Sequence, residues 1–208
     1  MISYYYVPEL KCCKDVEVKN SPKHGKGVFA TKRIKKGQCV GFYDGMMFEF
    51  ENGERDAPYI YLMLGCCFNN ADFLQNTLDP NFVIGGFPLP TRSRYGIATY
   101  INTGYASAIP DVNKQMFLNN CYRDVYWVDG KMGYKYITTR NIDKGEELLI
   151  DYGSIYWTKQ TPELEETRLN IQDTLREKFM FDDNIELNIN KWKENYDYMK
   201  NYINTLNF

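Results

Sequence analysis

Four short segments of the sequence contain residue types that could bind or react with a ligand. In residues 25–27, two glycines let the backbone turn tightly and approach a ligand closely. Asn102 offers an amide with both donor and acceptor atoms, the two kinds of group found on a purine edge. The other segments are the strand end at Tyr43 and the acidic stretch 142–153, which contains Tyr152. Because the chain has 18 tyrosines, any single tyrosine is expected to pack, and only the ordered combination indicates chemistry.

Two common kinds of site are not indicated. The glycine turn lacks the third glycine and the following helix of a dinucleotide-binding fingerprint. The chain has a single histidine, His24, which is expected to be an exposed loop residue, so the common metal sites and catalytic triads lose their usual residue. None of the six cysteines has C-x-x-C spacing, so we expect reduced thiols and no structural metal.

Composition and charge limit the class of protein. With 208 residues, 44% of them hydrophobic, the chain can bury a catalytic domain and a smaller helical appendage. Its 25 basic and 27 acidic side chains give a net charge of -2, which predicts no direct binding to nucleic acid or to an anionic membrane. The sequence contains no signal-peptide pattern and no apolar run of about 18 residues. We therefore expect an intracellular protein, located in the nucleus or cytoplasm. A viral protein that acts inside a host cell would also fit this expectation.

The first three quarters of the chain consist of short β-type runs separated by turn residues. The runs that predict strands are 27–30, 38–43, 81–84, 125–128 and 134–138. Asp129-Gly130 predicts a hairpin, because this pair supplies the positive φ angles of a tight turn between twisted strands. The pattern indicates a mainly β domain with several small sheets over residues 1–157, with its core at about 18–157.

After Trp157 the hydrophobic period lengthens, which predicts a helical C-terminal extension over residues 158–208. Residues 161–163, Thr-Pro-Glu, predict the start of a helix that runs to about Phe179. A second helix is expected after residues 182–184, because apolar residues recur in steps of four and three from Ile185 to Leu206. We expect this stripe to pack on its own chain; the alternative is a homodimer seam or a partner-docking arm.

In their order, the four segments resemble the SET-domain family of protein lysine methyltransferases. The family's Gly-x-Gly turn and strand are similar to residues 25–30, and its tyrosine-x-glycine to residues 43–45. Its aromatic-isoleucine-asparagine segment matches residues 100–102, and its asparagine-cysteine pair matches residues 120–121. The closing element of the family is nearly complete in residues 140–153, which include Gly-Glu-Glu-Leu and Asp-Tyr-Gly, and this match is the most specific.

This resemblance implies both a fold and an activity. The fold would be mainly β, of the β-clip or SET type, with small sheets around a pseudoknot in which the asparagine segment passes under the loop leading to the terminal tyrosine. The activity would be N-methylation of a lysine on a protein or peptide, with S-adenosylmethionine as the methyl donor. A histone tail is the first substrate class by analogy, followed by non-histone proteins, and the sequence does not indicate how many methyl groups are added.

The resemblance also implies roles for individual residues. Tyr152 and Tyr43 would be the catalytic pair, with Tyr152 orienting the amine and the methyl group and Tyr43 lining the lysine channel. The cofactor-binding group would be Lys26, Gly27, Asn102, Thr103, Tyr152 and Trp157. Within it, residues 26–27 would act through backbone groups, residues 102–103 at the adenine or amino-acid end, and Trp157 by stacking on the adenine, with a core role as its alternative.

Two departures from the family pattern matter. Thr103 and Gly104 stand where the family has histidine and serine, and an insertion of about ten residues separates them from Asn120. Cofactor contacts through backbone atoms survive such changes, whereas a histidine side-chain contact does not. The cysteine-rich zinc-binding flanks of many histone methyltransferases are also missing from this sequence. A catalytically silent SET-fold module that binds a peptide or partner is therefore the alternative to an enzyme.

Overall fold

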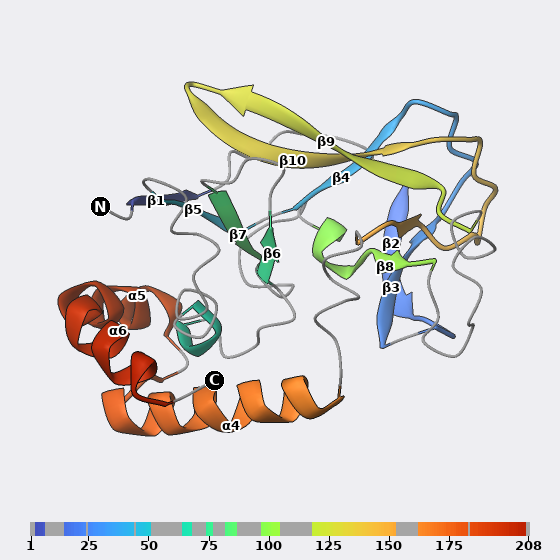
Figure 1. Ribbon diagram of the computed structural model, residues 1–208. Helices are drawn as coiled ribbons and strands as arrows, with labels where there is room; N and C mark the ends of the chain where they lie inside the picture. Colours follow the sequence, from blue (N-terminus) through green and yellow to red (C-terminus); the bar gives the residue numbers. More distant parts are fainter. Residues whose placement is uncertain are drawn as a thin grey trace. The chain divides into compact units, whose positions relative to one another are not determined.

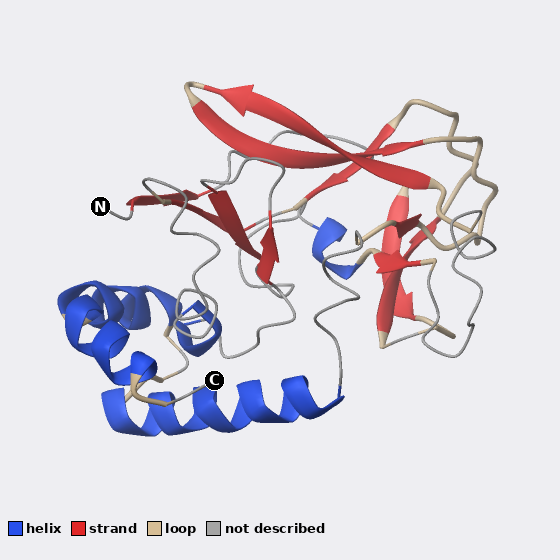
Figure 2. Ribbon diagram, viewed as in Figure 1, coloured by secondary structure: helices blue, strands red, loops and turns tan. Residues whose placement is uncertain are grey.

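Residues 3–6, 15–23, 25–43, 45–50, 64–67, 74–76, 82–86, 97–104, 118–152, 162–182 and 184–206 are described by the computed structural model. The chain divides into two units. One comprises residues 5–47 and 86–154 and holds most of the small sheets, and the other comprises residues 1–4, 48–85 and 155–208 and holds the long helices (Figures 1 and 2). The expected domain boundary near Trp157 lies outside the described residues and stays a prediction.

A three-stranded antiparallel sheet is the largest element of the first unit. Its strand order is β4-β10-β9, with β4 at Cys39–Phe42, β9 at Cys121–Val128 and β10 at Lys131–Thr138. The turn between β9 and β10 has positive φ at both Asp129 (50°) and Gly130 (74°), which confirms the predicted hairpin.

A second antiparallel pair carries the glycine turn. Strand β2 (Val16–Asn20) pairs with β3 (Lys26–Ala30), and the turn between them includes Gly25, whose φ is 49°. The acidic segment 145–148 runs antiparallel along the other edge of β3. The amide of Leu148 donates to the carbonyl of Val28 at 2.7 Å, and the amide of Ala30 donates to the carbonyl of Glu146 at 2.9 Å. The C-terminal motif of this unit is thereby fixed beside its N-terminal motif.

A short parallel pair joins the asparagine segment to the tyrosine segment. The 3-10 helix η3 (Ile97–Tyr100) leads into β8 (Asn102–Thr103), which pairs with β11 (Leu149–Ile150) in the register Asn102 to Leu149. These are the two segments that the expected pseudoknot brings together. The family-type fold, with small sheets that are mostly antiparallel and a helical C-terminal part, is confirmed.

A four-stranded sheet has the order β1-β5-β7-β6 (Figure 1). Its strands are β1 (Ser3–Tyr6), β5 (Gly45–Glu49), β6 (Leu74–Asn76) and β7 (Phe82–Gly86). Strand β7 confirms the run predicted at residues 81–84, and β6 pairs with it antiparallel. The side chains of Met46 to Phe48 on β5 are buried, so this strand contributes to the core.

The helical tail contains three helices. Helix α4 (Pro162–Phe179) begins and ends as predicted, and Asn184 caps α5 (Ile185–Glu194) by accepting from the amide of Leu187 at 3.0 Å. The prediction of a single second helix up to Leu206 is wrong, because the helix is interrupted at Asn195 and a new helix, α6 (Tyr196–Asn204), follows. The break lies in the backbone angles of Asn195 (φ -110°, ψ 15°), because its main-chain amide still donates to the carbonyl of Lys191 at 3.1 Å, beside the 2.8 Å hydrogen bond from its side chain.

The apolar stripe of the tail is buried within its own unit. Trp192 packs edge-on against Phe48 with ring centroids 5.9 Å apart, and four stripe side chains are at most 1% exposed: Ile189, Trp192, Met199 and Ile203. A stripe that is already covered offers little apolar surface to a second chain. Packing on the same chain, the favoured expectation, therefore agrees with the burial better than the homodimer seam does.

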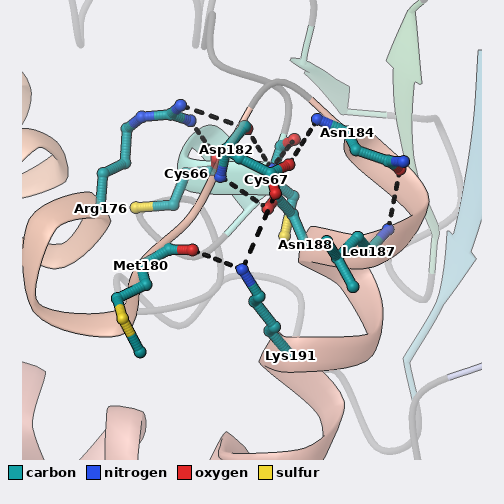
Figure 3. A network of polar contacts seen from close by, with 9 residues as sticks. All are labelled: Cys66, Cys67, Arg176, Met180, Asp182, Asn184, Leu187, Asn188 and Lys191. Carbon is teal, nitrogen blue, oxygen red and sulfur yellow. Dashed lines mark hydrogen bonds and ion pairs between the residues drawn. The ribbon is translucent and has the colours of Figure 1, made fainter.

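Buried polar contacts attach residues 64–67 to the helices (Figure 3). Arg176 of α4 donates to the carbonyl of Cys66 at 2.6 Å, and the fully buried Asn188 of α5 donates to the carbonyl of Cys67 at 3.4 Å. Desolvation by burial raises the pKa of the Cys66 thiol to about 12 and raises the pKa of the Cys67 thiol well above its ordinary value. These thiols are protonated at neutral pH and behave as packing groups.

Candidate active site

The glycine turn borders the candidate site, and within the turn Gly27 lies close to the side chains of Glu147 and Asn102. A Cβ atom at Gly27 would lie 2.2 Å from Oε1 of Glu147 and 3.0 Å from Nδ2 of Asn102. No side chain can occupy that space unless the carboxylate moves. The sequence therefore needs glycine at this position so that the side chains of residues 102 and 147 can reach the backbone of the turn.

The Asn102 side chain connects the turn to the acidic segment. Its Nδ2 atom donates to the carbonyl of Lys26 at 3.0 Å and to Oε1 of Glu147 at 2.9 Å. Both neighbours are acceptors, so the amide nitrogen must face them and both of its hydrogens are used within the protein. The other polar atom of the side chain, Oδ1, can act only as a hydrogen-bond acceptor. Recognition of both the donor and the acceptor of a purine edge, which the sequence allowed, does not fit this orientation.

Asn120 holds the start of strand β11 in place. It is 1% exposed, its Oδ1 accepts from the amide of Leu149 at 2.8 Å, and its Nδ2 donates to the carbonyl of Glu147 at 2.8 Å. Its own amide donates to the carbonyl of Leu149 at 3.0 Å. The Asn120 side chain thus satisfies the carbonyl of Glu147 and the amide of Leu149, as a neighbouring strand would. These bonds hold the backbone of Glu147 in place beside Asn102.

Tyr152 lies against the same segment as Asn102. Its hydroxyl donates to the carbonyl of Ile101 at 2.9 Å, and the ring is half-buried. With the hydrogen directed at Ile101, the phenol oxygen can act toward another group as an acceptor. An amine could donate one of its N–H groups to this oxygen. The lone pair of the amine nitrogen would then point away from the phenol.

Tyr43 lies in the core. It is 1% exposed, its ring centroid is 6.5 Å from that of Tyr136, and its amide donates to the carbonyl of Tyr134 at 3.0 Å. Burial also raises the pKa of Tyr136 above its ordinary value, so that phenol stays protonated. These contacts position Tyr43 through β10, and its expected place on the lysine channel stays a prediction.

An ion pair fastens the loop that precedes the acidic motif. The guanidinium of Arg140 donates to Oε2 and Oε1 of Glu146 at 3.1 and 3.0 Å, and the amide of Asp143 donates to Oε2 at 2.6 Å. The hydrogen bond from Arg140 holds the pKa of Glu146 below its usual value. Two adjacent glutamates therefore have different surroundings: Glu146 is paired with a cation, and Glu147 is directed at Asn102.

The structure brings together four of the expected site residues: Lys26, Gly27, Asn102 and Tyr152. Thr103 is adjacent to them, 8% exposed, and paired with Ile150 of β11. Trp157 and His24 lie outside the described residues. Sequence reasoning quoted the Gly-Glu-Glu-Leu motif but gave Glu147 no role. The available signal was an acid two residues before a short apolar run, Leu149–Ile150, which the structure shows to be a buried strand.

The comparison with known families decides the classification. The family model of the SET domain matches residues 25–153, more than half of the chain. The chain belongs to the SET-domain family. The SET domain thus covers the glycine turn, Asn102, Asn120 and Tyr152, all the residues from which the candidate site is built.

Solved structures and curated sequences add less. Similar structures include ATXR5 in complex with histone H3.1 mono-methylated on an arginine, at 25% identity and a TM-score of 0.45, and the ATXR5 SET domain in complex with di-methylated histone H3, at 26% and 0.45. Each alignment covers 68% of this chain, and the chain spans only 58% and 59% of those two chains. No curated protein sequence matched this SET-domain chain.

Two searches of the described residues complete the account. No group of three or more His, Cys, Asp or Glu side chains among them is placed to hold a metal ion. Of the helices that the structure describes, none combines the length and apolarity needed to cross a membrane.

Proposed function

We propose that this SET-domain protein is an S-adenosylmethionine-dependent protein-lysine N-methyltransferase. The observation that carries the proposal is the convergence of three distant segments. Tyr152 contacts Ile101, and the next residue, Asn102, contacts both Lys26 and Glu147. Family membership alone would support the fold, whereas this convergence supports a working site because it places a phenol, an amide and a glycine turn around one backbone segment.

The residues present fit the proposed cofactor. Gly27 carries no side chain, so the Glu147 carboxylate and the Asn102 amide can approach the turn closely, and the site offers backbone atoms and a negative edge to a ligand. Lys26, Gly27, Asn102 and Thr103 would hold the cofactor, with Asn102 at its amino-acid end, because an acceptor suits an ammonium group. S-adenosylmethionine, when bound, supplies an electrophilic methyl group on a positive sulfonium.

The remaining chemistry belongs to the protein and the substrate amine. A lysine attacks only when neutral, and its ordinary pKa is about 10.4, so the site must favour loss of a proton. Burial of the amine and a nearby positive charge both disfavour the ammonium form. Tyr152 would then accept a hydrogen bond from the neutral amine and direct its lone pair. Such alignment can contribute roughly 7 to 11 kcal/mol in favourable cases.

The substrate is proposed by class. A lysine in a histone tail comes first by analogy with the family, and a lysine in a non-histone protein comes next. Tyr43 would line the lysine channel and Trp157 would stack on the adenine, as the family resemblance implies. We place the protein inside a cell, in the nucleus or cytoplasm, where both kinds of substrate occur.

A methyl-transfer assay tests the proposal. Purified protein is incubated with radiolabelled S-adenosylmethionine and either core histones or a cell extract, and methyl-lysine is identified by mass spectrometry. We expect labelled methyl-lysine with the wild type and a large loss with Tyr152→Phe. Tyr122→Phe is the matched control, because Tyr122 is 47% exposed on β9. If neither histones nor any extract protein is methylated by the wild type, the enzyme proposal is wrong.

A silent binding module is the second candidate, and Thr103 favours it. This threonine is 8% exposed and stands where the family has a histidine, so one expected cofactor contact by a side chain is missing. Calorimetry separates the two functions. A protein that binds S-adenosylhomocysteine but methylates nothing is a silent module with a retained cofactor site, and one that binds no cofactor at high micromolar concentration is not a methyltransferase.

A further inference from the structure

Glu147 is a carboxylate at the candidate site that the proposed mechanism does not use. In the described part of the chain, no lysine or arginine lies within ion-pair distance of it, whereas the preceding Glu146 is paired with Arg140 at 3.0 Å. Glu147 is half-buried, and its Oε1 accepts from Asn102 at 2.9 Å. A carboxylate that is half-buried, held by a hydrogen bond and without a cation in the described residues can still take a positive group as a partner.

The backbone of residues 147 and 148 is held by three contacts, and the Glu147 side chain is held by its hydrogen bond with Asn102. The carbonyl of Glu147 accepts from the side-chain amide of Asn120, and the next main-chain amide, of Leu148, donates to the carbonyl of Val28. Glu147 also forms an antiparallel β-bridge with Phe29. The carboxylate consequently lies over Gly27, close enough that a single added methyl group would collide with it. Fixed groups of this kind are suited to positioning a ligand, because no side-chain entropy is lost when the ligand binds.

The orientation of Asn102 depends on Glu147. A carboxylate accepts hydrogen bonds and cannot donate them, so it requires the nitrogen of the Asn102 amide to face it. The carbonyl of Lys26 imposes the same requirement from the other side. The amide oxygen of Asn102 is thereby directed away from both, and it shares its end of the site with the negative charge of Glu147.

We propose that Glu147 is a positioning residue that makes this end of the site selective for an ammonium group, the α-amino group of the cofactor's amino-acid end. The inference rests on the proposed function and adds to it the charge that recognises that end. An acceptor alone would take a neutral amine or a hydroxyl almost as well. A nearby carboxylate favours the cation, because hydrogen bonds and contacts with an ionised partner are roughly twice as strong as neutral ones.

The test compares two ligands that differ at a single group. S-adenosylhomocysteine carries the ammonium, and its analogue with a hydroxyl in place of the amino group does not. Isothermal titration calorimetry with both ligands is carried out on the wild type and on three variants: Glu147→Gln, Glu147→Asp and Glu146→Gln. Thermal unfolding of each variant establishes that it is folded. The glutamine at position 147 keeps an oxygen that can accept from Asn102 but removes the charge.

The wild type should bind S-adenosylhomocysteine at least about tenfold more tightly than the hydroxyl analogue, as expected for a hydrogen bond to a charged group. Glu147→Gln should lose most of this preference through weaker binding of S-adenosylhomocysteine, with the analogue unaffected. Glu147→Asp should keep most of it, because the charge remains. Glu146→Gln, which removes the same charge one residue earlier, should behave as the wild type.

Three results would overturn the inference. If Glu147→Gln retains the wild-type preference, the charge is not used. If Glu147→Gln weakens both ligands equally, Glu147 is structural only. If the wild type binds S-adenosylhomocysteine without any preference over the analogue, this end of the site does not recognise ammonium. A wild type that binds neither ligand contradicts the proposed function itself, and the inference falls with it.

Discussion

The hydroxyl of Tyr152 donates a hydrogen bond of 2.9 Å to the carbonyl of Ile101, 51 residues earlier in the chain. This bond attaches the end of the tyrosine segment to the residue that precedes Asn102. It also settles which part of the phenol can face a substrate, because the hydrogen is already used. The role of Tyr152 and the orientation of Asn102 are therefore linked through one stretch of backbone.

Replacement of Tyr152 by phenylalanine should separate catalysis from stability. Loss of one part-buried hydrogen bond should lower the free energy of unfolding by about 1 kcal/mol, measured by urea denaturation. Loss of the oriented oxygen should lower kcat far more, on the order of 100-fold, because misalignment of the reacting groups has effects of that size. Binding of S-adenosylhomocysteine should change little. A variant with normal kcat would show that the phenol oxygen is not used.

Replacement of Gly27 by alanine should damage the site through a collision. The new methyl group would lie 2.2 Å from the Glu147 carboxylate, so both that side chain and Asn102 must shift. We expect a loss of about 1 to 3 kcal/mol in stability, as for other overpacked positions, and much weaker cofactor binding in calorimetry.

Gly25→Ala is the matched control for that variant. Gly25 has a φ of 49°, and no neighbouring atom lies within 4 Å of the position that an alanine methyl group would take. Only backbone strain of roughly 1 kcal/mol is therefore expected. If the two alanine variants weaken cofactor binding equally, the shape of the turn matters and the space at Gly27 does not.

Asn120→Ala should be strongly destabilising. The amide of Leu149 and the carbonyl of Glu147 would lose their partner in a region where Asn120 is only 1% exposed. Each unsatisfied buried group costs roughly 1 to 3 kcal/mol, so the total loss in urea denaturation should exceed that of any surface asparagine. Asn141→Ala, which removes one exposed hydrogen bond to the amide of Lys36, should cost under about 1 kcal/mol. Equal losses would show that the Asn120 contacts are solvated.

The ion pair between Arg140 and Glu146 should make a small, pH-dependent contribution to the free energy of unfolding. The hydrogen bond from Arg140 lowers the pKa of Glu146 in the folded protein, so the stabilisation is present above the ordinary glutamate pKa and is lost as pH falls through the folded value. The side chains are 48% and 37% exposed, which limits the effect at pH 7 to about 0.2 to 1 kcal/mol.

Urea denaturation of the wild type and of Glu146→Gln over a series of pH values checks this. The difference in unfolding free energy should be largest near neutral pH and should decline as the pH falls through the lowered pKa of Glu146 in the folded protein. A difference that persists in acid would mean that the contact from the amide of Asp143, at 2.6 Å, carries the effect.

Local turn chemistry made several elements predictable from the sequence. Asp129-Gly130 requires positive φ, and the hairpin follows directly. The Thr-Pro-Glu sequence predicted the first residue of α4, because proline is favoured at the first position of a helix. The order of glycine, asparagine and tyrosine segments also indicated a shared site, and the contacts of Asn102 with Lys26 and of Tyr152 with Ile101 agree with it.

Other features depend on tertiary contacts that periodicity does not encode. The break at Asn195 interrupts an apolar pattern that continues without a gap, because a change of backbone angles at one residue leaves the hydrophobic spacing unchanged. The place of Glu147 was missed since its partner is 45 residues away in sequence. Strand β2 was also missed, because its alternating pattern, Val16 to Asn20, is short and mostly polar.

The parallel pairing of β8 with β11 has a consequence for how the protein is made. Ribosomes release a chain from its N-terminus, and Asn102 cannot meet Leu149 until the later strand has emerged. The bridge from Phe29 to Glu147 spans a still longer stretch. Closing such large loops is slow, so the polypeptide should acquire its ligand-binding region in a late, rate-limiting stage of folding.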